Sequence, residues 1–173
     1  DIDNHTFGSS LENIKRVCSI NTRVVIAQHS FGIPCDIENI KNFCKEKNIF
    51  LIEDCALSFS SKKNGIILGN FGDASIFSTD HTKPINTMIG GMVYTKNLKL
   101  YNSLKNIQSN CKELPLIKRK YIWQQFLLEY YLLKPNTFLL FKFISRIIKL
   151  INKDYEPFLI DDRGTKFHNK YPY

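Results

Sequence analysis

Two short apolar runs separated by one amphipathic stretch most constrain how this 173-residue chain can fold. The runs are Val24 to Ala27 and Phe50 to Ile52, and the stretch between them carries apolar residues at helical spacing from Asp36, a candidate N-cap, to Lys47. A strand, a helix and a second strand in this order predict a right-handed parallel crossover. The sequence therefore predicts an α/β sheet with helices on its faces.

Polar residues follow the predicted strands at the points where they end. His29 comes just after the first strand and Asp54 closes the second. A third strand over 74–79 leads into a loop that carries Lys83, and a fourth follows over 91–95. Because open α/β sheets bind ligands beyond the carboxyl ends of their strands, we expect Asp54 and Lys83 to lie at one edge of the sheet.

A lysine and an aspartate at one sheet edge suit Schiff-base chemistry. The amine reaches a carbonyl, while the acid controls the charge of the conjugated system attached to it. Taken alone, however, a lysine before a proline is more often a solvated loop residue, and an aspartate at a strand end is often a cap. The order of the surrounding segments distinguishes these interpretations.

Five segments carry that order: VVIAQHSFG at 24–32, IEDCA at 52–56, GDASIFS at 72–78, Lys83, and GGMVYTK at 90–96. In order and spacing they resemble the DegT/DnrJ/EryC1/StrS family of pyridoxal-phosphate-dependent sugar aminotransferases, roughly over the first 105 residues. The resemblance implies the aspartate-aminotransferase-like fold (PLP fold type I), whose large domain is a mixed, mostly parallel sheet flanked by helices. Family members are longer, so we expect this chain to be a central fragment with an incomplete domain.

The resemblance also implies roles for individual residues. Lys83 matches the lysine that forms a Schiff base with pyridoxal phosphate and then moves a proton. Asp54 matches the acid that pairs with the pyridine nitrogen, and Ser78 matches a hydroxyl that contacts the phosphate. The family's related sugar dehydratases carry a histidine in place of the Schiff-base lysine. Lys83 therefore favours transamination over dehydration.

Other residues near this edge are candidates for supporting roles. His29 is expected to brace the strand end more than to lie near the cofactor, and Asp80 and His81 are candidates to contact substrate, cofactor or only backbone. Glu53 is expected on the opposite strand face from the aspartate. Leu57 stands where family members usually carry glutamine or histidine. A different substrate preference, or an inactive relative that acts as a binding or regulatory module, is the alternative that this departure leaves open.

The reaction implied by the resemblance moves an amino group, expected from glutamate, onto a keto-sugar nucleotide in polysaccharide, lipopolysaccharide or glycan biosynthesis. It also implies a homodimer with a shared active site. The five cysteines show no metal-ligand spacing, which favours reduced thiols in a cytoplasmic enzyme and predicts no metal. The formal charge of +8 comes from scattered lysines without a nucleic-acid-binding motif, so no nucleic acid partner is expected.

Residues 112–153 depart from the shorter members of the family. They predict two aromatic-rich amphipathic helices with a break at 134–136, neither having the roughly 20 uncharged residues of a spanning helix. Packing on the body or on a partner subunit is the favoured interpretation, and peripheral membrane contact through 121–151 is the alternative. We therefore expect 1–111 to be part of the cofactor-binding large domain, 112–153 to be a helical insertion, and 154–173 to begin an unassigned C-terminal region.

Overall fold

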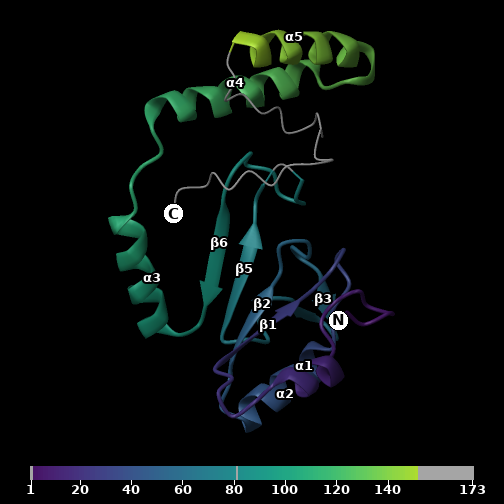
Figure 1. Ribbon diagram of the computed structural model, residues 1–173, viewed down its shortest axis with the longest axis vertical. Helices are drawn as coiled ribbons and strands as arrows, with labels where there is room; N and C mark the ends of the chain where they lie inside the picture. Colours follow the sequence, from purple (N-terminus) through teal and green to yellow (C-terminus); the bar gives the residue numbers. More distant parts are fainter. Residues whose placement is uncertain (1, 81, 152–173) are drawn as a thin grey trace. The chain divides into compact units, whose positions relative to one another are not determined.

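The computed structural model describes residues 2–80 and 82–151, which fall into two compact units divided between residues 111 and 112. The first unit is built on a four-stranded sheet in the order β1-β2-β5-β6 (Figure 1). Its strands are β1 (Val24–Gln28), β2 (Phe50–Asp54), β5 (Ala74–Ser78) and β6 (Gly91–Thr95). β2 is parallel to β1 and to β5, and β6 is antiparallel to β5. The sheet is thus mixed and mostly parallel.

Two helices pack together on one face of β1 and β2, α1 (Leu11–Val17) and α2 (Ile37–Glu46) (Figure 1). The buried apolar core lies between these helices and the sheet. It contains alternate residues of β1 and β2, namely Val25, Ala27 and Leu51. Their neighbours in the sequence, such as Val24 and Ile26, are exposed on the other face of the sheet.

The two helices begin differently. Ser10 has extended backbone angles, and its side chain accepts a hydrogen bond from the N–H of Asn13, as an N-cap should. Asp36 precedes α2 but has a ψ angle of 48° and makes no such bond. Its carboxylate instead accepts a hydrogen bond from the side-chain amide of Asn39 at 2.8 Å. The prediction that Asp36 caps the helix was therefore wrong, because its backbone does not place the side chain over the free N–H groups.

A small hairpin and a further helix complete the first unit. The hairpin pairs β3 (Lys62–Lys63) with β4 (Ile66–Ile67) across Asn64 and Gly65, which both have positive φ angles. An Asn-Gly pair in this conformation is the usual two-residue hairpin turn. Helix α3 (Leu98–Asn110) follows β6, and the side chain of Asn97 caps it by accepting the N–H of Leu100 at 3.1 Å.

The second unit is a helical hairpin. It contains α4 (Leu116–Leu132), a single 3₁₀ turn η1 (Pro135–Thr137) and α5 (Phe138–Ile151), and the two long helices contact each other. The predicted pair of helices and the break between them are both present. Among the described residues, no helix has the length and apolarity needed to cross a membrane. The C-terminal region expected over 154–173 lies outside the described residues.

A buried carboxylate connects β2 to the loop that precedes β5. Glu53 is fully buried, and its Oε1 accepts the backbone N–H groups of Phe71 at 2.7 Å and Gly72 at 2.6 Å. Its Oε2 accepts the N–H of Gly69 at 2.8 Å. Gly72 has no room for a side chain, because a Cβ would lie 2.8 Å from the carbonyl oxygen of Leu51. The loop therefore wraps closely around one carboxylate.

His29 supplies the fourth hydrogen bond to Glu53. Its Nε2 lies 3.2 Å from Oε2 of Glu53, and its Nδ1 accepts the backbone N–H of Cys35 at 3.1 Å. Since Nδ1 is an acceptor, the ring proton lies on Nε2 and is donated to the carboxylate. Burial by itself would raise the pKa of Glu53, but the hydrogen bonds from His29 and from the three backbone N–H groups outweigh burial and lower that pKa below 4.5.

We expect Glu53→Gln to lower the free energy of unfolding by about 2 to 4 kcal/mol at neutral pH, because an amide cannot accept four hydrogen bonds. The lowered pKa stabilises the folded state fully above about pH 4.5, and this contribution is lost as the pH falls through the folded-state pKa. Urea unfolding at a series of pH values should therefore show a weaker acid dependence in the variant.

The matched control for that prediction is Glu46→Gln, which removes an exposed carboxylate at the end of α2. It should change the free energy of unfolding by less than about 0.5 kcal/mol. If the Glu53 and Glu46 variants unfold alike at every pH, the buried network does not stabilise the fold in the way described.

Candidate functional site

The register of the sheet places Asp54 and Ser78 on the same face. Asp54 of β2 pairs with Ile76 of β5, and Ser78 lies two residues further along β5. Because side chains alternate along a strand, Ile76 and Ser78 share the face of Asp54. This face is the one opposite α1 and α2. Both side chains are half-buried at the carboxyl ends of parallel strands.

The backbone around Asp54 holds its carboxylate at the strand end. Oδ1 accepts the N–H of Ala56 at 3.0 Å, which forms a tight local turn. The carbonyl of Asp54 accepts the N–H of His29 at 3.1 Å, and the N–H of Cys55 is donated to the carbonyl of Ile76 at 2.9 Å. Asp54 is thus held from both neighbouring strands, β1 and β5.

Lys83 lies in the loop that joins β5 to β6 and emerges at this same edge. The base of the loop is closed by the N–H of Thr79, which donates to the carbonyl of Gly90 at 3.0 Å. Thr87 also binds Thr79. The N–H of Thr87 donates to the carbonyl of Thr79 at 2.8 Å, and the hydroxyl of Thr87 donates to the hydroxyl of Thr79 at 2.7 Å. The lysine therefore sits on a loop whose two ends are fixed.

Within the loop, the N–H of Lys83 donates to the carbonyl of Asp80 at 2.9 Å, and the lysine side chain is half-buried. The N–H of Asp80 lies 3.4 Å from Oγ of Ser78, which acts as the acceptor. That arrangement leaves the hydroxyl proton of Ser78 available to a further acceptor. The structure thus brings Asp54, Ser78 and the loop of Lys83 to one edge, while His81 lies outside the described residues.

His29 does not join this group with its side chain. The imidazole lies in the interior against Glu53, on the side of the sheet that α2 covers, and only its backbone N–H contacts Asp54. We propose that His29 braces the ends of β1 and β2 and does not touch a ligand. The side chain of Ser58 supports the same corner by donating to the carbonyl of His29 at 3.2 Å.

Gln28 is a neighbour of the site that sequence reasoning missed. It pairs with Asp54 across β1 and β2 and is exposed on the same face. Strand alternation would have found it, because Gln28 follows the exposed Ile26 by two residues. Its amide can donate as well as accept hydrogen bonds, so it adds a neutral polar group beside the carboxylate.

Ligand atoms of His29, Glu53 and Cys55 lie within 4.8 Å of one another in the interior. Both ring nitrogens of His29 already have hydrogen-bond partners, and so do both oxygens of Glu53. Burial, followed by the negative charges of Glu53 and Asp54, raises the pKa of the Cys55 thiol to about 12. His29 and Glu53 are therefore part of a hydrogen-bonded network, and both would have to give up these partners to bind a metal ion.

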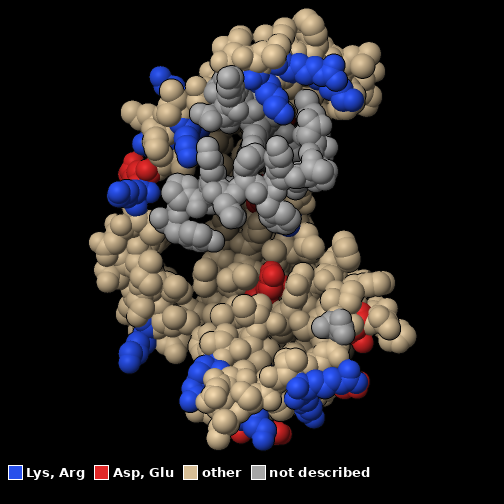
Figure 2. All heavy atoms as spheres, in the orientation of Figure 1, with Lys and Arg blue, Asp and Glu red and all other residues tan. Residues whose placement is uncertain are grey.

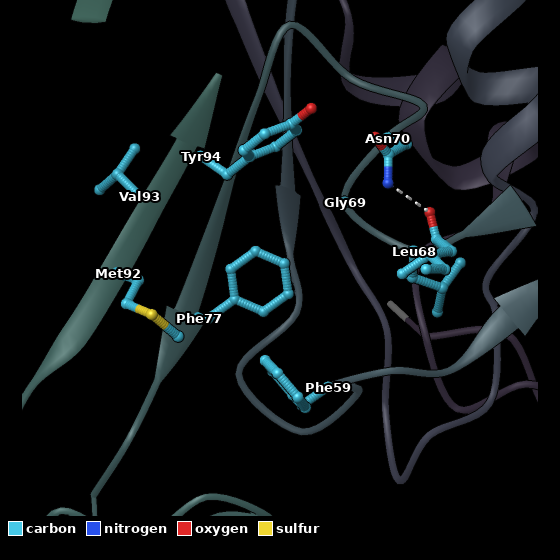
Figure 3. A pocket seen from close by; sticks show the side chains of 9 residues that line it. Phe59, Leu68, Gly69, Asn70, Phe77, Met92, Val93 and Tyr94 are labelled. Carbon is cyan, nitrogen blue, oxygen red and sulfur yellow. Dashed lines mark hydrogen bonds between the residues drawn. The ribbon is translucent and has the colours of Figure 1, made fainter. Parts of the chain in front are cut away.

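An apolar hollow of about 450 Å³ lies on the face of the sheet opposite Asp54, between the β3–β4 hairpin and strands β5 and β6. Figure 3 shows Phe59, Phe77, Met92 and Tyr94 around it. Phe59 and Phe77 meet edge to face, with ring centroids 5.9 Å apart. Among the described residues, no charged side chain lines the hollow, so it offers no positive charge to a phosphate. Asp54, Ser78 and the loop of Lys83 lie at the sheet edge and do not line this hollow.

Three known proteins show what the chain resembles. GDP-perosamine synthase of Escherichia coli O157:H7 is 42% identical over 102 residues, which cover 59% of this chain and 28% of that protein. An aminotransferase structure from Psychrobacter cryohalolentis matches with a TM-score of 0.59 and 28% identity over 61% of this chain and 27% of the other. E. coli GDP-4-keto-6-deoxy-D-mannose-3-dehydratase with bound hydrated PLP matches with a TM-score of 0.56, 28% identity and the same coverage.

The chain thus spans less than a third of the length of each of these relatives. The structural matches confirm the predicted fold, part of the large domain of a PLP-type aminotransferase with a mixed, mostly parallel sheet. A family model matches residues 1–125, which include the whole first unit, its sheet edge and the lysine loop. The chain belongs to the DegT/DnrJ/EryC1/StrS aminotransferase family.

Proposed function

We propose that this chain carries the central part of a pyridoxal-phosphate-dependent sugar aminotransferase, which moves an amino group from glutamate onto a keto-sugar nucleotide. One observation carries the proposal. A carboxylate and a hydroxyl, Asp54 and Ser78, share one face and one edge of the sheet, next to the anchored loop of Lys83. Those are the three groups that the cofactor's ring nitrogen, phosphate and aldehyde need.

The donor set at this edge fits pyridoxal phosphate. The carboxylate of Asp54 is half-buried, so water would screen its attraction to a protonated pyridine nitrogen less than on an open surface. The hydroxyl proton of Ser78 is available to a phosphate oxygen, as its own oxygen already accepts from Asp80. The amine of Lys83 is carried by a loop that is fixed at both ends. Further phosphate donors are expected from other parts of the protein or from a second subunit.

When bound, pyridoxal phosphate supplies a conjugated ring that stabilises negative charge on the α-carbon of an amino substrate. In the proposed site, Asp54 holds the proton on the ring nitrogen, and its negative charge favours that protonated form. Lys83 would hold the cofactor through its amine, the aldehyde oxygen leaving as water, and the same amine, once freed by the substrate amine, would move a proton at the substrate α-carbon. Ser78 orients the phosphate by donating a hydrogen bond.

The substrate class comes from the relatives. The name of the E. coli O157:H7 relative indicates a GDP-linked amino sugar, and the PLP-bound relative is a dehydratase of a GDP-linked keto sugar. We infer a keto-sugar nucleotide as acceptor and glutamate as donor, for the synthesis of a polysaccharide, lipopolysaccharide or other glycan in the cytoplasm. Lys83 favours amino transfer over dehydration, because the dehydratases of the family carry a histidine at that position.

We infer a homodimer in which a second subunit completes the site. Residues 1–111 would belong to the large cofactor-binding domain and 112–153 would be a helical insertion, although the family match extends into α4.

The alternative is an inactive relative that binds a cofactor or sugar nucleotide for regulation. Leu57 favours that alternative, since a half-buried leucine in the turn after Asp54 cannot donate a hydrogen bond to the ring.

Sodium borohydride reduction of the whole protein with pyridoxal phosphate should attach the cofactor to Lys83. Mass spectrometry of the peptides is expected to show the added pyridoxyl group on the Lys83 peptide and none in Lys83→Ala, since only that lysine lies in the anchored loop. Amino transfer should fall by at least about 1,000-fold in Lys83→Ala, because it loses both the covalent bond and the proton transfer.

Lys96→Ala is the matched control, because Lys96 is exposed just after β6. It should keep the trapped cofactor and the activity. Trapping at Lys83 without turnover of any keto-sugar nucleotide would favour the regulatory alternative. Trapping on other lysines alone would contradict the proposed site.

Two further substitutions separate the roles of the other groups. Ser78→Ala should weaken pyridoxal phosphate binding by roughly 10-fold or more, the typical loss for one hydrogen bond to a charged group. Asp54→Asn should lower kcat far more than it lowers cofactor binding, because an amide does not favour the protonated ring. Fluorescence titration with the cofactor and steady-state kinetics test these expectations. Equal effects of both substitutions on binding and on kcat would contradict the assignment.

A further inference from the structure

Helix α5 presents three distinct stripes along its length. Residues three, four and seven apart lie on the same side of an α-helix. Phe141 and Ser145 are buried, and they mark the side on which the helix is covered. The exposed positions form two further stripes, one basic and one apolar.

The basic stripe consists of Lys142, Arg146 and Lys149, at positions i, i+4 and i+7. It runs beside the covered side, and Figure 2 shows basic side chains gathered over α5. The ammonium group of Lys142 also lies 4.9 Å from the centre of the Phe138 ring. No acidic residue occurs in α5, so this stripe has a single sign of charge along the whole helix.

The apolar stripe lies on the far side of the basic one. Leu139 and Leu150 are 80% and 81% exposed, although they are among the most apolar residues of the helix. The other members of the stripe are also exposed: Leu140, Phe143, Ile147 and Ile151. No charged residue interrupts it. In water such a continuous apolar strip along four turns costs free energy, which indicates that something apolar covers it in use.

Charge favours a lipid surface over a protein as the covering partner. The described residues 112–151 hold eight basic and two acidic residues, a net charge of +6. Lysine is depleted in the cores of protein interfaces, whereas long basic side chains beside an apolar strip suit a bilayer with anionic headgroups. Helix α5 has only 14 residues, so it is too short to cross a bilayer and suits an orientation in the plane of the interface.

We propose that α5 binds the surface of an anionic bilayer, with its apolar stripe in the headgroup region and its basic stripe on the lipid phosphates. The exposed aromatic side chains of the neighbouring helix α4 also suit the headgroup region. Helix α4 contacts α5 and exposes Trp123, Tyr130 and Tyr131, residue types that favour the boundary between water and lipid. The proposal does not depend on the proposed reaction, since it concerns a surface that the site residues do not share.

The test is co-sedimentation of the whole protein with two kinds of vesicle, phosphatidylcholine alone and phosphatidylcholine with added phosphatidylglycerol. Binding is expected to the anionic vesicles and to weaken with added salt. Replacing Lys142, Arg146 and Lys149 together by glutamine should weaken binding by on the order of 100-fold, about five-fold for each charge. Leu139→Ser with Leu150→Ser should also abolish it, since these exposed leucines supply the buried apolar area.

The matched control replaces Lys96, Lys99 and Lys105 of the first unit by glutamine, which removes the same charge from exposed positions. This variant should bind the anionic vesicles as the unchanged protein does. Circular dichroism and urea unfolding establish that each variant is folded. Equal losses in the control and α5 variants would show that only net charge matters and would overturn the proposal.

Two other outcomes would also overturn it. The folded protein could stay in the supernatant with both kinds of vesicle. Alternatively, Leu139→Ser with Leu150→Ser could change the oligomeric state, measured by light scattering, without any vesicle binding by the parent. That result would assign the apolar stripe to a protein interface.

Discussion

The buried carboxylate of Glu53 is the interaction on which the rest of the first unit depends. It accepts hydrogen bonds from three backbone N–H groups of one loop and from the imidazole of His29, the residue that follows β1. A buried charge without these partners would cost several kcal/mol, so the carboxylate and its donors must be assembled together. The next residue along β2 is Asp54, on the opposite face. One strand therefore places one carboxylate in the core and the other at the proposed site.

This arrangement explains how the site can be rigid although its residues lie at strand ends and in a loop. Asp54 is held by hydrogen bonds from β1, from β5 and from its own turn. The loop of Lys83 is held at its base by Thr79 and Thr87. Reactive groups that are positioned in advance lose little entropy when a ligand binds. Rigidity at this edge would suit a covalently bound cofactor that must be held against the reacting α-carbon of a substrate.

Each unit also has an exposed apolar surface that includes none of Asp54, Ser78 and Lys83. The hollow beside Phe77 lies on the face opposite Asp54, and the apolar stripe of α5 belongs to the second unit. Among the described residues, neither the lining of the hollow nor the apolar stripe includes a positively charged side chain. Exposed apolar side chains favour contact with another apolar surface, which is a bilayer in our proposal for α5.

The sequence by itself determined the features that depend on local period and order: the strand–helix–strand crossover, the helical hairpin after residue 112, and the positions of Asp54 and Lys83 after successive strands. The order of its motifs also predicted the family to which the chain belongs. Only the tertiary structure decided that His29 turns inward to Glu53, that Gln28 stands level with Asp54, and that Asp36 does not cap α2. The physical reason is that a periodic pattern specifies which face a residue takes, whereas its partner depends on strand register and backbone angles across distant parts of the chain.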